Sequence, residues 1–223
     1  MSKRAKIWDR FAAGHAKRPV PDEGAYQKKL EVTRGYFRPD MEVLEFGCGT
    51  GTTAIHHAPH VKHILATDVS AKMLEIARRK ADAAGVTNVT FQQVDIDDLD
   101  VPDASVDVVM GHSILHLVED RDAVIAKVHR MLKPGGVFVS STMCLGDTMV
   151  WFKLVGPVGR FFGLIPLVKV FRVQDLFDSL TAAGFAIDHQ WQPGRGKAVF
   201  IVAKKVGLHR HTSVPNTVTG GDT

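Results

Sequence analysis

The stretch that decides the fold is Val43-Leu-Glu-Phe-Gly-Cys-Gly-Thr-Gly51, in which a short apolar run leads directly into a turn rich in glycine. Gly47, Gly49 and Gly51 allow the backbone to turn sharply, and they allow a ligand to approach where a Cβ atom would collide. The residues that follow are typical of a helix, whose N-terminus offers unpaired N–H groups to a carboxylate or a phosphate. We interpret the stretch as a strand, a ligand-binding loop and the start of a helix.

The loop alone does not identify the ligand. A Walker loop requires Gly-Lys-Ser/Thr, which is missing here. A dinucleotide-binding loop requires glycine or alanine three places after Gly49, where Thr52 stands, and this disfavours a nicotinamide-dependent oxidoreductase. A purely structural turn also stays open at this point.

Outward from the loop, strand-like runs alternate with helical patterns. The strand candidates are short, rich in Val, Ile and Phe, and bounded by Gly, Asp or Pro; they cover residues 42–46, 64–68, 89–94, 106–110 and 137–142. Helical spacing of apolar residues covers 70–84 and 120–132, with a turn at 134–136 after the second helix. This alternation predicts an α/β protein with a doubly wound, mostly parallel sheet and helices on both faces.

The C-terminal part breaks this alternation. A helical pattern at 173–183 precedes two strand candidates, 185–190 and 198–204, that are joined by the short linker 192–197. Because this linker is too short for a helical crossover, we expect an antiparallel hairpin and an antiparallel last strand. Residues 207–223 are polar and rich in Gly and Thr, and we expect them to be disordered.

Acidic residues stand where three of the strands end. Glu45 lies in the first strand beside the loop, Asp68 ends the second strand, and Asp95 follows the third. Ligands of doubly wound folds bind at the carboxyl ends of the strands, and an acidic residue about twenty positions after the loop can accept both hydroxyls of a ribose. The pattern therefore predicts one binding edge.

These residues resemble the class I S-adenosylmethionine (SAM)-dependent methyltransferases of the small-molecule type. Residues 45–51 are similar to the first motif of that family, 68–74 to the second and 94–96 to the third, and 132–136 resemble its turn before the fifth strand. The resemblance implies a seven-stranded sheet of order 3-2-1-4-5-7-6 with SAM as the cofactor. It also implies methyl transfer to a small, fairly apolar acceptor at an O, N or S atom, and it leaves that acceptor unidentified.

The resemblance also implies roles for single residues. Asp68 is expected on the ribose, Met73 against the adenine, Asp95 on the adenine amino group and Ile96 beside the ring. The full set of expected cofactor-binding residues is Glu45, Phe46, Gly47, Cys48, Gly49, Asp68, Val69, Met73, Asp95, Ile96, His112 and Tyr26.

The segment after the fourth strand, residues 110–117, supplies the catalytic candidates. An acceptor that loses a proton needs a base, and His112 and His116 are the candidates there. Related enzymes often carry Asn, Asp or Ser where His112 stands, and this departure keeps open a non-catalytic, SAM-binding regulatory protein. For His116, packing of a helix is the competing interpretation.

Other polar clusters are predicted to be structural. Residues 56–63 contain four histidines, but Pro59 breaks the helix that would align them, and no carboxylate or cysteine joins them. We therefore expect a solvated connection and no metal site. Cys48 is expected to pack, and the basic run 78–80 to form a solvated helix face.

The domain organisation follows from these elements. We expect an N-terminal helical cover at 1–40, a SAM-binding domain at 41–206, and an apolar insertion at about 143–172 that closes over the acceptor. Tyr26 and Lys29 belong to the cover. Basic residues in the insertion permit contact with an anionic membrane, so a phospholipid or quinone methyltransferase is the alternative.

Composition sets the outer limits. The 223 residues are 45% hydrophobic and 23% charged with a net charge of +4, which is typical of a globular protein. The two cysteines exclude a disulfide scaffold, and the scattered Lys and Arg residues predict no nucleic-acid partner. With no signal peptide or spanning segment recognised, we expect a cytoplasmic protein with a small-molecule acceptor and leave its oligomeric state open.

Overall fold

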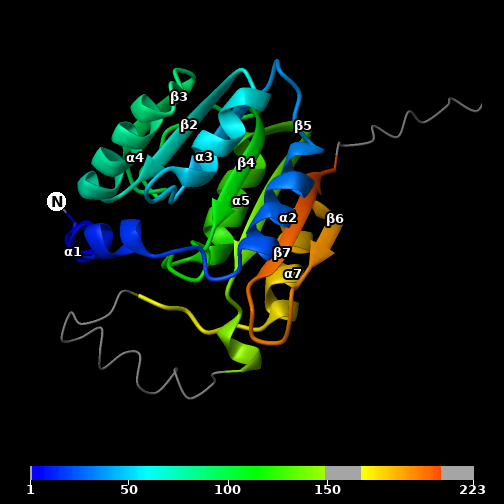
Figure 1. Ribbon diagram of the computed structural model, residues 1–223. Coiled ribbons are helices and arrows are strands. Elements are labelled where there is room, and N and C mark those ends of the chain that lie inside the picture. Colours follow the sequence, from blue (N-terminus) through cyan, green and yellow to red (C-terminus); the bar gives the residue numbers. More distant parts are fainter. Residues whose placement is uncertain (1, 149–166, 207–223) are drawn as a thin grey trace, which may run out of the picture.

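A computed structural model describes residues 2–148 and 167–206. Its centre is one seven-stranded sheet of order β3-β2-β1-β4-β5-β7-β6, as the sequence predicted (Figure 1). The strands are β1 Glu42–Phe46, β2 His63–Asp68, β3 Val89–Gln93, β4 Val106–His112, β5 Leu132–Thr142, β6 Phe185–Trp191 and β7 Val199–Lys205.

The strand pairing separates a parallel part from an antiparallel part. β1 pairs in parallel with β2 and β4, and the parallel pairing extends to β3 on one side and β5 on the other. β7 runs antiparallel to both β5 and β6, which confirms the predicted hairpin and the antiparallel last strand. The parallel strands β1 to β5 therefore end at one common edge.

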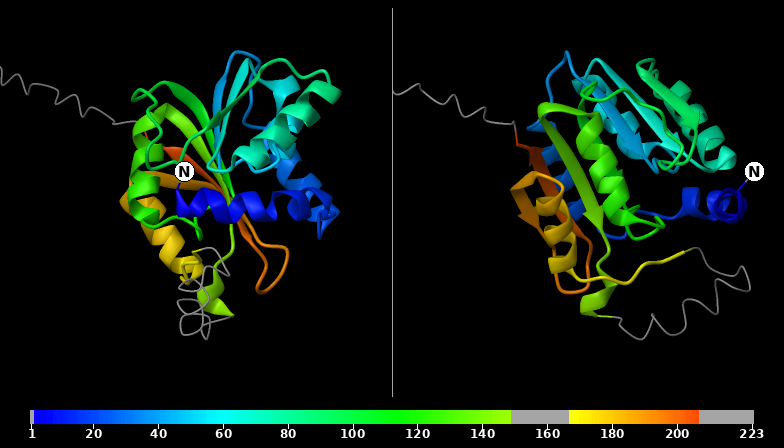
Figure 2. Two further views of the ribbon diagram at one scale, coloured as in Figure 1. Left: turned by 90° about the vertical axis from the view of Figure 1, so that its left-hand side faces the viewer. Right: turned by 180° about the vertical axis from the view of Figure 1, so that it is seen from behind.

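Helices cover both faces of the sheet, as predicted (Figure 2). Apolar side chains of α5 and α7 join one core cluster, and those of α2, α3 and α4 join the other, on the opposite face. The helices are α1 Lys3–Lys17, α2 Glu23–Arg34, α3 Thr52–His57, α4 Ala71–Ala83, α5 Arg121–Met131 and α7 Val173–Ala182, with short 3₁₀ turns at Ala58–His60 and Leu145–Asp147. α1 belongs to neither layer; it crosses the carboxyl edge of the strands and packs against α4.

Local chemistry fixes the helix ends. The Ser70 hydroxyl accepts a hydrogen bond from the Met73 amide at 3.2 Å and so begins α4. Asp120 begins α5 in the same way, through the Ala123 amide at 3.0 Å. After α7, Gly184 adopts φ +91°, a left-handed conformation that ends the helix where the sequence predicted.

One boundary differs from the prediction. Residues 132–136 were expected to form a turn before a strand at 137, but β5 begins at Leu132. Leu132 already pairs with Val106, and a register shift between Val106 and Val108 accommodates the glycines that follow. Pairing along β4 therefore extends the strand into the expected turn.

Two predictions fall wholly or mainly outside the described residues. The tail 207–223 is one, and the central part of the apolar insertion, residues 149–166, is the other. The described flanks of the insertion meet, because the Gly146 amide donates to the Phe171 carbonyl at 2.8 Å. Over residues 2–148 and 167–206, no helix combines the length and apolarity required to cross a bilayer.

Candidate cofactor and acceptor site

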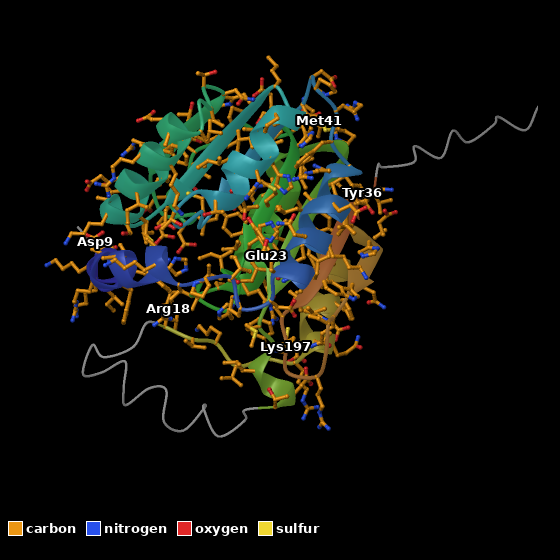
Figure 3. All side chains as sticks on the ribbon, viewed as in Figure 1. Asp9, Arg18, Glu23, Tyr36, Met41 and Lys197 are labelled. Atoms are coloured by element: carbon orange, nitrogen blue, oxygen red, sulfur yellow. The ribbon has the colours of Figure 1, made fainter. Side chains whose placement is uncertain are left out.

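A cavity of about 540 Å³ lies at the carboxyl edge of the parallel strands. Its volume is within the roughly 300–1,000 Å³ typical of small-ligand sites. In Figure 3, Asp9 and Arg18 mark α1 and Glu23 marks the start of α2, the two helices whose side chains line the cavity together with the loop after β1. The lining includes every residue of the predicted cofactor set: Tyr26, Glu45, Phe46, Gly47, Cys48, Gly49, Asp68, Val69, Met73, Asp95, Ile96 and His112.

The loop after β1 needs glycine for two reasons. Gly47 and Gly51 adopt φ +65° and +72°, in the left-handed region. A Cβ atom at Gly47 would lie 2.7 Å from the Ile114 side chain, and one at Gly51 would lie 2.8 Å from Ala77. The loop is therefore held close to its neighbours and leaves its outer side to the cavity.

Asp68 is bound to the backbone through both carboxylate oxygens. Oδ2 accepts from the Gly49 amide at 2.9 Å, and Oδ1 accepts from the Ser70 amide at 2.8 Å. Burial raises the pKa of Asp68, while the two amide bonds act in the opposite direction. Each oxygen keeps a second lone pair, so the carboxylate is fixed and still able to accept from a diol.

Glu45 is buried at the floor of the cavity, with 2% of its surface exposed. Its Oε2 atom has no hydrogen-bond partner, and burial raises the pKa of the carboxyl to about 8. A buried carboxyl of this kind is unfavourable until a cation or a donor pairs with it. This end of the cavity therefore fits a ligand that carries a positive charge.

The helix α1 lies in the predicted N-terminal cover and contributes two residues that the sequence did not single out, Arg4 and Asp9. Arg4 Nη1 lies 2.5 Å from Asp95 Oδ2, and the Ser70 hydroxyl donates to Asp9 Oδ1 at 2.6 Å. Trp8 also lines the cavity. No local pattern marks Arg4, because its role depends on the packing of α1 against α4.

In the basic run 78–80, Arg78 and Arg79 are exposed as the sequence predicted, but Lys80 is half-buried. Lys80 Nζ donates to the hydroxyls of Thr50 and Thr52, at 3.0 Å each, and Lys80 lines the cavity. Arg78 donates to the Phe91 carbonyl at 3.0 Å. The helical twist turns Lys80 toward the loop, while Arg78 and Arg79 remain exposed to solvent.

In the histidine-rich connection 56–63, His56 and His60 are exposed as predicted, but His57 is not. His57 is 0% exposed, and its ring packs edge-on against Phe37 with 4.9 Å between centroids. Neither ring nitrogen has a hydrogen-bond partner, and burial lowers the pKa of His57 to about 3. Instead of lying in a solvated connection, His57 is a neutral side chain that lines the cavity.

His112 and His116 occupy different environments. His112 ends β4 opposite Ser141 and lines the cavity; its Nε2 atom has no partner, and burial lowers its pKa to about 4. His116 is not among the lining residues, although burial lowers its pKa to about 4 as well. The structure thus brings only one of the two catalytic candidates to the cavity.

Lys29 and Tyr26 extend from α2 over the ends of the strands. Lys29 Nζ donates to the Ser141 hydroxyl at 2.8 Å, and the Tyr26 hydroxyl lies 3.5 Å from the Thr53 hydroxyl. Apolar side chains of Leu30, Ile114 and Leu117 line the same cavity. We call the part of the lining formed by the glycine loop, Glu45 and Asp68 the cofactor end, and the part formed by Lys29, His57 and His112 the acceptor end.

A doubly wound sheet of this order, with a glycine loop at the switch point, defines a Rossmann-like domain with its site at the carboxyl edge. Residues 43–136 match the model of the methyltransferase domain family. This match, together with relatives and solved structures that are named as methyltransferases, supports a class I SAM-dependent methyltransferase.

Relatives and a solved structure agree with this family. The uncharacterized methyltransferase YcgJ of Bacillus subtilis is 34% identical over 110 residues, which cover 49% of this chain and 44% of that protein. The demethylmenaquinone methyltransferase of Symbiobacterium thermophilum is 30% identical over 142 residues, covering 60% and 56%. The chain thus spans about half the length of the curated relatives it matches. An S-adenosylmethionine-dependent methyltransferase from Mesorhizobium loti shares the fold, with a TM-score of 0.65, 22% identity, and coverage of 82% and 99%.

SAM is the cofactor of this family, and the lining residues fit it. The cofactor combines a ribose diol and a sulfonium with the ammonium and carboxylate groups of its methionine part. Asp68 offers fixed acceptors to a diol, and the unpartnered oxygen of Glu45 offers an acceptor to an ammonium. The glycine loop leaves the space between them open.

Proposed function

We propose that the chain transfers a methyl group from SAM to a small, fairly apolar acceptor. The observation that carries this proposal is a single cavity that combines the cofactor-type end with a second end, lined by apolar side chains and His112. Transfer in one step requires both molecules in one desolvated space. The Symbiobacterium relative carries the name of a quinone methyltransferase, which supports an apolar acceptor.

The reaction requires alignment more than specialised side chains. When bound in the cavity, SAM would supply an electrophilic methyl group with the sulfur as its leaving group. Placing two reactants for in-line attack contributes on the order of 7–11 kcal/mol. Here side chains of α1 and α2, among them Trp8 and Tyr26, line the cavity.

His112 is proposed to orient the nucleophile. Because burial holds its pKa at about 4, the ring is neutral at pH 7 and its unpartnered Nε2 can accept a hydrogen bond. A group with a pKa of about 4 is a weak base at pH 7. We therefore assign His112 the role of orienting the nucleophile and not that of removing its proton. His116, which does not line the cavity, is given no part in the transfer.

The proposal is tested in two measurements. Calorimetry with SAM and NADH is expected to show binding of SAM alone, and binding of NADH instead would overturn the cofactor assignment. A screen of phenols, thiols, amines, carboxylic acids and quinols then follows the formation of S-adenosylhomocysteine. Tight SAM binding without turnover of any acceptor would favour a regulatory protein that binds SAM without catalysis.

A further inference from the structure

The excess positive charge of the protein is concentrated on α1, the helix that crosses the carboxyl edge of the strands (Figure 2). Residues 3–18 contain six Lys or Arg residues and one acidic residue, Asp9. The net charge of the whole chain is +4, so over the remaining residues acidic side chains slightly outnumber basic ones. Elsewhere the Lys and Arg residues are scattered among acidic residues, whereas this helix has a local excess of five positive charges.

One side of α1 holds the helix on the protein. Ala5 and Ala12 are 3% and 1% exposed, and the helix packs against α4. Asp9, on the same side, accepts hydrogen bonds from the Ser70 hydroxyl at 2.6 Å and from the Lys72 amide at 3.2 Å. The acidic side chain of α1 is therefore turned inward, and it does not neutralise the basic side chains on the other side.

The outer side of α1 is basic and exposed. Its exposed basic side chains recur at helical spacing and so form one basic stripe along the helix: Lys3, Lys6, Arg10 and Lys17. Among the described residues, no carboxylate forms an ion pair with any of these four. Single exposed lysines are ordinary at a protein surface, but four aligned cations without an acid between them create a continuous positive potential.

Two large apolar side chains are exposed beside this stripe. Phe11 and Val20 are 42% and 41% exposed, and in the described part of the chain the other exposed large apolar residue is Val206. The Phe11 ring lies edge-on to Trp8, with 6.2 Å between the ring centroids. Because each residue turns the helix by about 100°, Phe11 lies between the basic stripe and Trp8. Trp8 and Val20 line the cavity, so an apolar border separates the stripe from the cavity.

We propose that the outer side of α1 docks on an anionic lipid surface. The basic stripe lies on the phosphate groups of the lipids, and Phe11 and Val20 enter the boundary between headgroups and acyl chains. Helices with a basic face and apolar side chains beside it bind membrane interfaces in this way. The inference goes beyond the proposed function, because it concerns where the protein binds and not which reaction it performs.

Docking through α1 places the cavity next to the lipid. The residues that follow the helix, 18–21, line the cavity, and Val20 among them belongs to the proposed contact. For a fairly apolar acceptor, this brings the cavity to the phase into which such molecules partition. The contact is separate from the one that the sequence suggested at the insertion, because it uses no residue of 143–172.

The exposed apolar side chains favour lipid over nucleic acid as the partner. Either partner neutralises the basic stripe. Burial of Phe11 and Val20 in lipid contributes free energy in proportion to their apolar area. A nucleic acid offers stacking to the Phe11 ring and no comparable contact to the aliphatic Val20.

Vesicle binding tests the inference on the full chain. Sedimentation is measured with vesicles of phosphatidylcholine alone and with vesicles that also contain phosphatidylglycerol. We expect at least about tenfold tighter binding to the anionic vesicles. Most of this difference should disappear between about 0.1 M and about 1 M salt, where the Debye length falls from about 10 Å to about 3 Å. Absence of binding to the anionic vesicles, or equal binding to both kinds, would overturn the proposal.

Paired charge variants assign the binding to α1. Lys6→Gln combined with Arg10→Gln is expected to weaken binding to the anionic vesicles about 30-fold, because each basic residue near such a surface contributes about fivefold. The matched control is Arg38→Gln combined with Lys62→Gln, two exposed residues that precede β1 and β2 at the opposite edge of the sheet. Full binding by the α1 pair, or an equal loss in the control pair, contradicts the assignment.

Phe11 distinguishes lipid from nucleic acid. Phe11→Ser keeps every charge of α1 and is expected to weaken vesicle binding about fivefold, since an apolar side chain no longer enters the lipid. Vesicle binding that is unchanged in this variant would show that the apolar border takes no part, and it would overturn the docking geometry. Binding of an RNA oligonucleotide of mixed sequence that requires Lys6 and Arg10, in a protein that does not bind anionic vesicles, would assign the stripe to nucleic acid instead.

The affinity for S-adenosylhomocysteine separates this inference from the proposed function. Each variant is first measured for it by calorimetry, and an unchanged affinity shows that the variant folds. A wild-type chain that binds anionic vesicles but not S-adenosylhomocysteine contradicts the proposed function alone. A wild-type chain that binds S-adenosylhomocysteine but not the vesicles contradicts the docking alone.

Discussion

The two ends of the cavity differ in how their polar groups are satisfied. At the cofactor end, Asp68 is held by the amides of Gly49 and Ser70, and Lys80 by two threonine hydroxyls. At the acceptor end, His57 and His112 keep unpartnered nitrogens and Lys29 has a hydroxyl for its partner. Glu45 is the exception at the first end, with one unpartnered oxygen.

At the cofactor end, the backbone and neighbouring side chains already satisfy most polar groups. At the acceptor end, polar groups remain unsatisfied until a ligand binds. A side chain that is hydrogen-bonded to a loop is fixed by the same motif that forms the loop. Side chains that come from α2, α3, β4 and β5 share no local motif and meet only in the tertiary fold. The first end is therefore recognisable from sequence, and the second is specific to this chain.

The largest effect is expected from Asp68→Ala. The change removes the proposed acceptor for the ribose and leaves the Gly49 and Ser70 amides unpaired, at a cost of about 1–3 kcal/mol for each buried group. SAM affinity measured by calorimetry should fall about 100-fold or more. Asp82→Ala, an exposed change on α4, is the control. Unchanged affinity in Asp68→Ala would show that the cofactor end does not bind the ribose there.

His112→Ala tests the acceptor end through its effects on turnover and on SAM affinity. We expect turnover to fall on the order of 30-fold with SAM affinity unchanged, since the ring is proposed to contact the acceptor's nucleophile. Because its pKa is lowered to about 4, the neutral ring persists down to that pH, and turnover should lose its His112-dependent part only near pH 4. His60→Ala, at an exposed site, is the control. A loss centred near pH 6.5 would contradict the buried environment.

Glu45→Gln tests whether the unpartnered carboxylate oxygen at the cofactor end binds the ammonium group of SAM. With a pKa of about 8, the carboxyl is mostly protonated at pH 7, and an ammonium bound beside it favours the ionised form. SAM binding at pH 7 should therefore release close to one proton, measured by calorimetry in buffers of different ionisation enthalpy. In Glu45→Gln the release should disappear and affinity should fall about tenfold. Equal proton release in both proteins would place the ammonium elsewhere.

Glu45 also makes the stability of the free protein depend on pH. Its pKa is raised on folding from 4.5 to about 8, so between these values the folded state binds more protons than the unfolded state. The free energy of unfolding should then decrease as pH rises through this window. Urea unfolding at pH 5 and pH 8 should show this decrease in the wild type and a smaller one in Glu45→Gln.

The smallest effect is expected from Arg4→Met. The Arg4–Asp95 pair is partly exposed, at 22% and 18%, and such pairs contribute about 0–1 kcal/mol. SAM affinity should fall about two- to threefold, with a larger change in the susceptibility of α1 to proteolysis. Arg79→Met removes an exposed pair with Glu75 and is the control. A loss of affinity as large as that of Asp68→Ala would mean that Arg4 itself contributes strongly to SAM binding.

Most of the fold was predictable because it depends on local patterns. The caps Ser70 and Asp120, the left-handed Gly184 and the apolar strands each act within a few residues. The start of β5 was predicted wrongly, because pairing of Leu132 with Val106 is a contact between distant parts of the chain.

The sequence by itself determined the cofactor end: the glycine loop and the acidic strand ends lie in continuous motifs, and parallel strands must bring their ends to one edge. Only the tertiary structure decided the acceptor end and the position of α1. His57 was expected in solvent and is buried, Lys80 turned inward, and Lys29 reached Ser141 across 112 positions of sequence. Burial and charge compensation are properties of packed neighbours, so no local pattern could specify them.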